Sequence, residues 1–266
     1  MLGDTHAVRD AVAAVVAGRV VAHGFGNFYA LSCRPDGPAV RAMNRLKGRP
    51  EDQVGSITAP PSRIAALFDW TRLPDGVTRQ QLLSLADLLY GIGPFGLRGP
   101  AATGLPDHLT TVQDGVRTVQ LIAPGYACPS NGFLAEALAA TGGDFLAITS
   151  ANRSRRMTGT AEEPAHWQLA PLRAEFDSHP EMVFLPHQDE PAARRAHPRH
   201  RPMSTTVLAF HYTAPASSGR PRLTVERQGS LPLPDLREAA DRAGFTIALS
   251  PHARTVTERR YPVVLG

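Results

Sequence analysis

The chain has 266 residues, a net charge of +4 and a sequence pI near 9.5. Hydrophobic residues make up 42% and charged residues 20%, as in ordinary globular proteins, which excludes a disordered or fibrous chain. The weak positive balance favours anionic partners such as nucleotides without singling out RNA. Since no run approaches the ~18–20 apolar residues of a spanning helix and the N-terminus lacks the order of a signal peptide, we expect a cytoplasmic protein with no membrane partner.

Segments with helical and β-strand periodicity alternate along the chain, and this alternation predicts an α/β sheet. In chain order, the sequence predicts a helix over residues 6–17, strands over 19–22 and 28–31, a helix over 38–46, a strand over 56–59, a helix over 80–90, a strand over 117–123, a helix over 131–140, and strands over 145–149, 182–185, 205–211 and 222–227.

Glycine and proline mark the breaks between these elements. Residues 23–27 predict a tight glycine-containing loop between two strands, and residues 91–100 predict a loop. Residues 188–202, rich in Pro, Arg and His, predict another loop. We expect one main domain over residues 1–240 and a C-terminal extension over 241–266, which carries further β-prone runs and has no role that the sequence indicates.

Two cations separated by a glycine follow the second predicted helix, as Lys47-Gly48-Arg49. Because they stand at a break between helix and loop, both side chains can turn toward one polyanion, and a triphosphate would suit them. The ordinary alternative is a solvated basic turn. One detail favours a function: Lys47 is the only lysine in a chain that otherwise uses arginine.

Small polar side chains follow a later apolar strand. Ser150 and Asn152 come directly after residues 145–149, and ligands of open α/β sheets bind at the carboxyl ends of strands. Taken alone, these residues are more typical of a helix cap or a side-chain turn. Ser204 precedes the strand predicted over residues 205–211, and Arg227 ends the strand predicted over 222–227. Taken alone, Ser204 is more typical of an ordinary polar residue and Arg227 of a surface charge than of a binding site.

Taken together and in order, these segments resemble the YrdC/TsaC family, the threonylcarbamoyl-AMP synthases. The hallmarks of that family are a Lys-x-Arg after an early helix and a Ser-x-Asn after a later strand, which stand here as Lys47-x-Arg49 and Ser150-x-Asn152. The resemblance covers residues 8–240, and ordered co-occurrence over that span is far more specific than either motif.

The resemblance implies a twisted mixed, mainly parallel sheet curved around a large basic cavity. Proteins of the family condense threonine, bicarbonate and ATP into threonylcarbamoyl-adenylate and pyrophosphate for tRNA modification. By matching position, the ATP site would be lined by Lys47, Arg49, Ser150, Asn152, Ser204 and Arg227. Lys47 and Arg49 would be catalytic by stabilising charge on the phosphates, and Mg²⁺ would accompany the nucleotide.

The departures from the family pattern lie around the amino-acid substrate. Where the family has Pro-Thr-Asp/Glu-Thr before its tyrosine, this chain has Gly24-Phe25-Gly26-Asn27, which removes two hydroxyls and a carboxylate. The substrate-binding positions would then be Phe25, Asn27 and Tyr29. A pocket without those polar groups discriminates poorly for threonine, so the sequence leaves two alternatives for the substrate: threonine itself, or a different amino acid or related small molecule.

Two other classes of function remain open from the sequence. A module that binds a nucleotide or RNA without catalysis would keep the basic cavity, and a partner-binding scaffold would keep only the fold. Metal binding by His187, His197 and His200 is a further alternative, but their spacing is irregular, and we expect no metal site.

Overall fold

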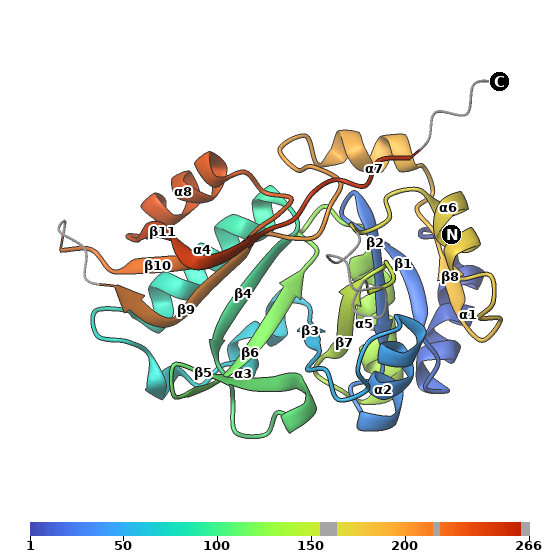
Figure 1. Ribbon diagram of the computed structural model, residues 1–266, viewed down its shortest axis with the longest axis horizontal. Coiled ribbons are helices and arrows are strands. Elements are labelled where there is room, and N and C mark those ends of the chain that lie inside the picture. The colour runs from blue at the N-terminus through green and yellow to red at the C-terminus, as the bar shows by residue number, and fades with distance from the viewer. Residues whose placement is uncertain (155–163, 215–218, 262–266) are drawn as a thin grey trace.

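The computed structural model describes residues 1–154, 164–214 and 219–261, which form one twisted sheet with helices packed around it (Figure 1). The α-helices are α1 (Thr5–Val16), α2 (Gly37–Leu46), α3 (Ile64–Leu67), α4 (Arg79–Ile92), α5 (Ser130–Thr141), α6 (Leu169–Glu175), α7 (Glu190–Ala196) and α8 (Leu233–Arg242). The strands are β1 (Val21–Phe25), β2 (Phe28–Cys33), β3 (Ser56–Thr58), β4 (Phe95–Pro100), β5 (Thr110–Gln113), β6 (Val116–Ala123), β7 (Leu146–Ser150), β8 (Val183–Leu185), β9 (Val207–Ala214), β10 (Arg222–Gln228) and β11 (Thr246–Thr255).

The strands follow the order β11-β10-β9-β4-β6-β3-β7-β2-β1-β8, and β5 pairs with β6 beside this path. The parallel pairs are β1–β8, β3–β6, β4–β9 and β10–β11. The other described pairs are antiparallel and more numerous. The expected α/β class and mixed sheet are therefore confirmed, but parallel pairs do not predominate among the described strands as the resemblance implied.

Two tight hairpins account for part of the antiparallel pairing. Asp114 (φ 49°) and Gly115 (φ 73°) connect β5 to β6, and positive φ at both central residues is typical of a type I′ turn. Gly26 (φ 60°) and Asn27 connect β1 to β2, with the glycine at the position that a type II′ turn reserves for it. Two-residue loops of this kind permit only antiparallel neighbours, so this turn sets the direction of β2. The loop predicted over residues 23–27 is shorter than expected, because residues 23–25 pair with β2 as part of β1.

The helices begin at side-chain N-caps, close to the residues where the apolar pattern of each helix begins. The Asp4 carboxylate accepts hydrogen bonds from the backbone N–H groups of His6 (2.9 Å) and Ala7 (3.2 Å) at the start of α1. Thr78 and Gln81 form a reciprocal capping box at the start of α4. Such caps satisfy N–H groups that have no partner within the helix, so the predicted helix positions are confirmed to within a few residues.

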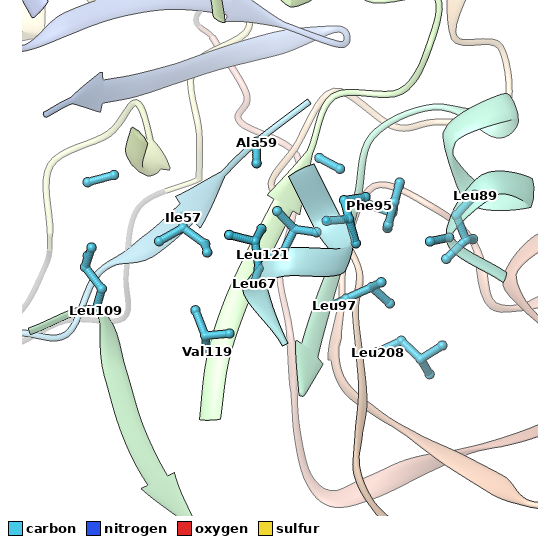
Figure 2. Close-up of a cluster of buried hydrophobic side chains, with 14 of the residues drawn as sticks. Ile57, Ala59, Leu67, Leu89, Phe95, Leu97, Leu109, Val119, Leu121 and Leu208 are labelled. Atoms are coloured by element: carbon cyan, nitrogen blue, oxygen red, sulfur yellow. The ribbon is translucent and has the colours of Figure 1, made fainter. Parts of the chain in front are cut away.

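The main hydrophobic core lies against one face of the central strands, under α3 and α4. Figure 2 shows side chains from β3, β4, β6 and β9 meeting those of the helices, among them Ile57, Leu97, Val119, Leu121, Leu208, Leu67 and Leu89. Because side chains alternate between the two faces of a strand, the residues between these core positions point to the opposite face. That opposite face lines the cavity described below.

Two segments predicted as loops contain regular structure. Residues 95–100 form β4, and its glycines reflect close packing, since a Cβ at Gly99 would lie 2.0 Å from the Phe210 ring. Within residues 188–202, α7 begins with Pro191 in its first turn and Asp189 as its N-cap, which accepts from the N–H of Ala192 (3.0 Å). Both predictions were wrong because glycine and proline were interpreted as breaks, whereas here they serve packing and helix initiation.

The boundary expected at residue 240 falls inside α8, and residues 246–255 form β11, which pairs with β10 in the same sheet. The expected extension therefore adds an edge strand to the main sheet. Its last β-prone run, residues 263–265, lies outside the described residues. No helix in the described ranges is both long and apolar enough to cross a membrane.

Candidate functional site

A cavity of about 750 Å³ opens on the inner face of the curved sheet. Arginines enter it from α2's C-terminal loop, β4, β10 and β11, as Arg49, Arg98, Arg227 and Arg254. The described lining residues include no carboxylate; the remaining polar ones carry hydroxyls or amides. The expected large basic cavity is therefore present in this fold, and its chemistry suits a polyanion.

The Lys47-Gly48-Arg49 turn is a Schellman motif that ends α2. The N–H of Arg49 bonds to the carbonyl of Asn44 (3.1 Å), and the N–H of Gly48 bonds to the carbonyl of Arg45 (2.8 Å). Gly48 has φ 65°, a left-handed conformation that glycine adopts without a Cβ penalty. This turn gives the side chains of Lys47 and Arg49 different surroundings, although they are two residues apart.

Lys47 joins the end of α2 to the end of β7. Its ammonium donates to the Ser150 carbonyl and to Asn152 Oδ1 (3.1 Å), and the N–H of Ser154 donates to the Lys47 carbonyl (2.7 Å). The side chain is fully buried and is not among the residues that line the cavity. The two motifs therefore meet, about a hundred residues apart in sequence, but direct contact of Lys47 with a phosphate remains a prediction.

Arg49 does line the cavity, beside the hydroxyls at the end of β7. Asn44 Oδ1 accepts from Arg49 Nε (2.7 Å), and Thr149 Oγ1 lies 3.4 Å from Arg49 Nη1. Ser150 also lines the cavity, and its hydroxyl donates to Asn152 Oδ1 (2.5 Å). Asn152 is fully buried behind these residues, so it supports Ser150 and Lys47 in this structure.

Ser204 and Arg227 line the same cavity from the other half of the sheet. Arg227 donates through Nε to the Thr205 carbonyl (2.7 Å) and through Nη2 to Thr205 Oγ1 (2.9 Å). A bulge between Val225 and Arg227 interrupts the pairing of β10 with β9 and leaves Glu226 as the extra residue. Bulges redirect side chains, and this one presents Arg227 to the cavity while Glu226 reaches β4.

The three expected substrate-binding residues have different places. Phe25 lines the cavity together with Phe28 and Ala30, whereas Asn27 and Tyr29 are not among its lining residues. Asn27 donates its amide to the His200 carbonyl (2.9 Å), and the buried Tyr29 hydroxyl donates to Glu190 (2.8 Å). Since β2 alternates and directs Phe28 and Ala30 to the cavity, Tyr29 faces away from it.

A group of buried histidines packs around the β1–β2 hairpin. Burial lowers the pKa of His23 to about 4 and that of His200 to about 4. His187 hydrogen-bonds the Phe28 carbonyl (3.1 Å), and burial lowers its pKa as well. In the part of the chain that the structure describes, no three His, Cys, Asp or Glu side chains are arranged to hold a metal ion. The lowered pKa values keep His23, His187 and His200 neutral near pH 7, where they pack and form hydrogen bonds.

The C-terminal segment, residues 255–261, crosses the top of the molecule from β11 toward α7 (Figure 1). Thr255, Val256 and Thr257 line the cavity. Beyond them, Arg259 pairs with the Glu175 carboxylate (2.6 Å). Burial alone would raise the pKa of Glu175, but His166, a backbone N–H and Arg259 together lower that pKa to about 2. This segment forms part of the cavity wall, a role that its sequence did not indicate.

Comparison with known proteins gives a result at the level of the fold. No protein-family model and no curated protein sequence matches the chain. Among solved structures, P. abyssi Sua5 complexed with L-threonine aligns with a TM-score of 0.63 and 19% identity, over 91% of this chain and 58% of that one. The chain has a YrdC-like fold.

Two further structures extend this comparison. A hypothetical protein from Streptococcus mutans aligns with a TM-score of 0.62 at 12% identity, over 91% of this chain and 94% of that one. HypF from T. kodakarensis aligns with a TM-score of 0.53 at 17% identity, over 86% of this chain and 25% of that one. The YrdC-like fold thus occurs both in chains of this length and within longer proteins, and this chain spans 58% and 61% of the two Sua5 chains that it matches.

Proposed function

We propose that the protein is an ATP-dependent enzyme that forms a carbamoyl-type adenylate from an amino acid, bicarbonate and ATP, for RNA modification. The observation that carries this proposal is the junction of Lys47 with Ser150 and Asn152 at the wall of a cavity that Arg49 and Arg227 also line. Cations and hydroxyls from distant segments converge on one cavity. This arrangement favours a triphosphate site over the alternative of a solvated basic turn without a ligand.

The residues present fit a nucleotide. Arg49 and Arg227 would balance phosphate charge, and the hydroxyls of Ser150 and Ser204 would bond phosphate or ribose oxygens. Mg²⁺ bound together with the nucleotide would be held by the phosphates and water. Bound Mg²⁺ would add further neutralisation of the phosphate charge.

The chemistry needs no protein nucleophile. The amine of the amino acid and bicarbonate give a carbamate and water; a carbamate oxygen then bonds to the α-phosphorus as the bond to pyrophosphate breaks. Arg49 and Arg227 would hold the phosphates and stabilise the charge that moves onto the leaving pyrophosphate. Lys47 would act as a positioning residue, because its ammonium fixes the Ser150 carbonyl and the Asn152 amide.

We infer that the amino acid is not threonine. Phe25, which stands in the segment where the resemblance would place hydroxyls and a carboxylate, lines the cavity beside Phe28, and the two residues are 0% and 2% exposed. An apolar wall cannot discriminate strongly in favour of a hydroxyl-bearing side chain. An apolar or aromatic amino acid fits this wall better, since it buries apolar surface against the two rings.

The test is pyrophosphate release from ATP·Mg²⁺, measured with each of the common amino acids in the presence and absence of bicarbonate. We expect release that requires an amino acid and bicarbonate, falls at least about a hundredfold in Arg49→Gln because a transition-state charge partner is lost, and is unchanged in Arg45→Gln. Arg45 is a suitable control because it pairs with Glu51 on the surface, where both side chains are about half exposed (56% and 49%). ATP binding without release for any amino acid would instead indicate a non-catalytic nucleotide-binding module.

A further inference from the structure

A row of polar side chains crosses the inner face of the sheet from β10 over β4 and β6 to β3. Arg98 on β4 is the register partner of Gln120 on β6, and its Nη2 donates to Gln120 Oε1 (2.5 Å). Gln120 in turn donates to the hydroxyl of Ser56 on β3 (3.0 Å). At the other end, Arg98 Nε donates to the carboxylate of Glu226 (2.7 Å). We call Glu226, Arg98, Gln120 and Ser56 the polar row.

The polar row is costly for the fold. The neighbours of its members, such as Leu97, Leu121 and Ile57, belong to the hydrophobic core on the opposite face. The side chains of Arg98 and Glu226 are only 13% and 18% exposed, and burying an ion pair seldom stabilises a protein more than apolar residues would. Core stability therefore does not explain it.

Arg98 keeps donors available for a ligand. A guanidinium has five N–H groups in a fixed fork, and the bonds to Glu226 and Gln120 use two of them. The other three have no hydrogen-bond partner among the described residues, and Arg98 lines the cavity. A planar fork of this kind matches the two oxygens of a carboxylate.

The row leads to the apolar wall. Ser56 is the register partner of Ile148 on β7, and Ile148 belongs to one apolar cluster with Phe25 and Phe28. A molecule with its carboxylate at Arg98 would therefore direct an apolar body along the sheet toward the two phenylalanines. The order of groups is cation, amide, hydroxyl and then aromatic rings.

Arg98 is too far from the end of β7 to serve the same small anion as Ser150. Strands β6 and β3 lie between β4 and β7, so three steps between strands, at ~4.8 Å each, separate the two places by ~14 Å. One carboxylate or one phosphate cannot contact both. Arg98 and the residues at the end of β7 are therefore two separate candidate positions for an anion.

We propose that Arg98 binds the carboxylate of the co-substrate while Glu226 orients Arg98. The apolar body of the co-substrate extends past Gln120 to Ile122, which belongs to one apolar cluster with Phe25 and Phe28. The identification of that co-substrate as an amino acid rests on the function proposed above; the binding of an apolar carboxylate does not. Since Glu226 offsets part of the positive charge of Arg98, the two residues have opposite effects on anion binding, although they form one ion pair.

The test measures binding by calorimetry to the full chain, with ATP and with L-phenylalanine, L-leucine and their carboxamides as probes. We expect the carboxylates to bind at least about tenfold more tightly than the carboxamides, since an amide lacks the charge that Arg98 complements. Arg98→Gln should weaken carboxylate binding at least about tenfold and leave ATP binding unchanged. Glu226→Gln should strengthen carboxylate binding about threefold or more, because the competing charge is gone while the hydrogen bond can persist.

Arg63→Gln is the matched control, because Arg63 pairs with Asp144 on the surface, where both side chains are 55% exposed. It should change neither affinity. The opposite signs of the Arg98 and Glu226 variants separate ligand binding from a structural role, since loss of a structural ion pair would weaken binding in both. If Arg98→Gln proves unfolded, Glu226→Gln and the carboxamide comparison still decide the question.

Four results would overturn the proposal: no probe carboxylate binds, carboxamides bind equally well, Glu226→Gln weakens carboxylate binding, or Arg98→Gln weakens ATP and carboxylate binding alike. Its failure is distinguishable from failure of the proposed function. Carboxylate binding that depends on Arg98, without pyrophosphate release, would remove only the function. Release from an amino acid that Arg98→Gln does not affect would remove only this subsite.

Discussion

Replacing Lys47 with methionine tests the buried connection between α2 and β7. The ammonium donates to two neutral acceptors, the Ser150 carbonyl and Asn152 Oδ1. Asn152 Oδ1 keeps the Ser150 hydroxyl as a donor and the Ser150 carbonyl keeps the N–H of Asn152, so each acceptor loses only its bond to the ammonium. A hydrogen bond to a charged group is worth ~1.5–3 kcal/mol, whereas removing the ammonium relieves part of its own desolvation cost. We therefore expect Lys47→Met to lower the free energy of unfolding by ~2–4 kcal/mol, which for a chain of this size lowers Tm by ~5–15 °C.

The assay is thermal denaturation followed by circular dichroism, with Arg45→Met as the matched control. Arg45 lies two residues earlier in the same helix and pairs with Glu51 at the surface, so its loss should change stability by less than ~0.5 kcal/mol. If Lys47→Met melts within 1 °C of the wild type, the ammonium does not hold the two elements together, and the positioning role is refuted.

Further predictions concern the hairpin, the α2 turn and the C-terminal segment. The pKa of His23 and of His200 is about 4 when folded, against 6.5 unfolded. The stabilising contribution of these neutral histidines is therefore fully present above pH 6.5, and the free energy of unfolding falls by ~3 kcal/mol per histidine as the pH is lowered to 4. An unchanged midpoint of urea denaturation between pH 7 and pH 4.5 would contradict this. Gly48→Ala should cost ~1–2 kcal/mol in thermal denaturation because φ is 65°, whereas Gly91→Ala, in the last turn of α4, should not destabilise. Glu175→Gln should accelerate tryptic cleavage of the C-terminal segment, and equal cleavage rates would show that the Glu175 contacts do not hold it.

The fold was largely predictable because most of its elements bury one regular face. The periodicity of residues 80–90 and 131–140 identified α4 and α5, and the apolar run before Ser150 identified β7. Prediction failed where a residue type had two uses. The glycines of β4 admit the Phe210 ring and a neighbouring strand, but in a sequence they resemble loop glycines.

The site was predictable only in part. Short motifs located Arg49, Ser150 and Arg227, but the motif spacing did not show that Lys47 would be buried behind the wall. Tyr29 could not have been excluded, because only the structure shows which face of β2 turns to the cavity; Phe28 and Ala30 line it, and strand alternation then turns Tyr29 away. Arg98 could not have been found, since its pairing depends on the register of β4 with β6 and on the bulge at Glu226. Neither leaves a local pattern in the sequence.

The most direct test of the central claim is calorimetric titration of ATP·Mg²⁺ into the wild type, Arg49→Gln and Arg63→Gln. Arg49 lines the cavity beside the end of β7, whereas Arg63 pairs at the surface with Asp144. We predict binding of one nucleotide per chain, weakened at least about tenfold, or ~1.4 kcal/mol, in Arg49→Gln and unchanged in Arg63→Gln. Equal affinity in the wild type and Arg49→Gln, or no binding to the wild type, would contradict the assignment of this cavity to ATP.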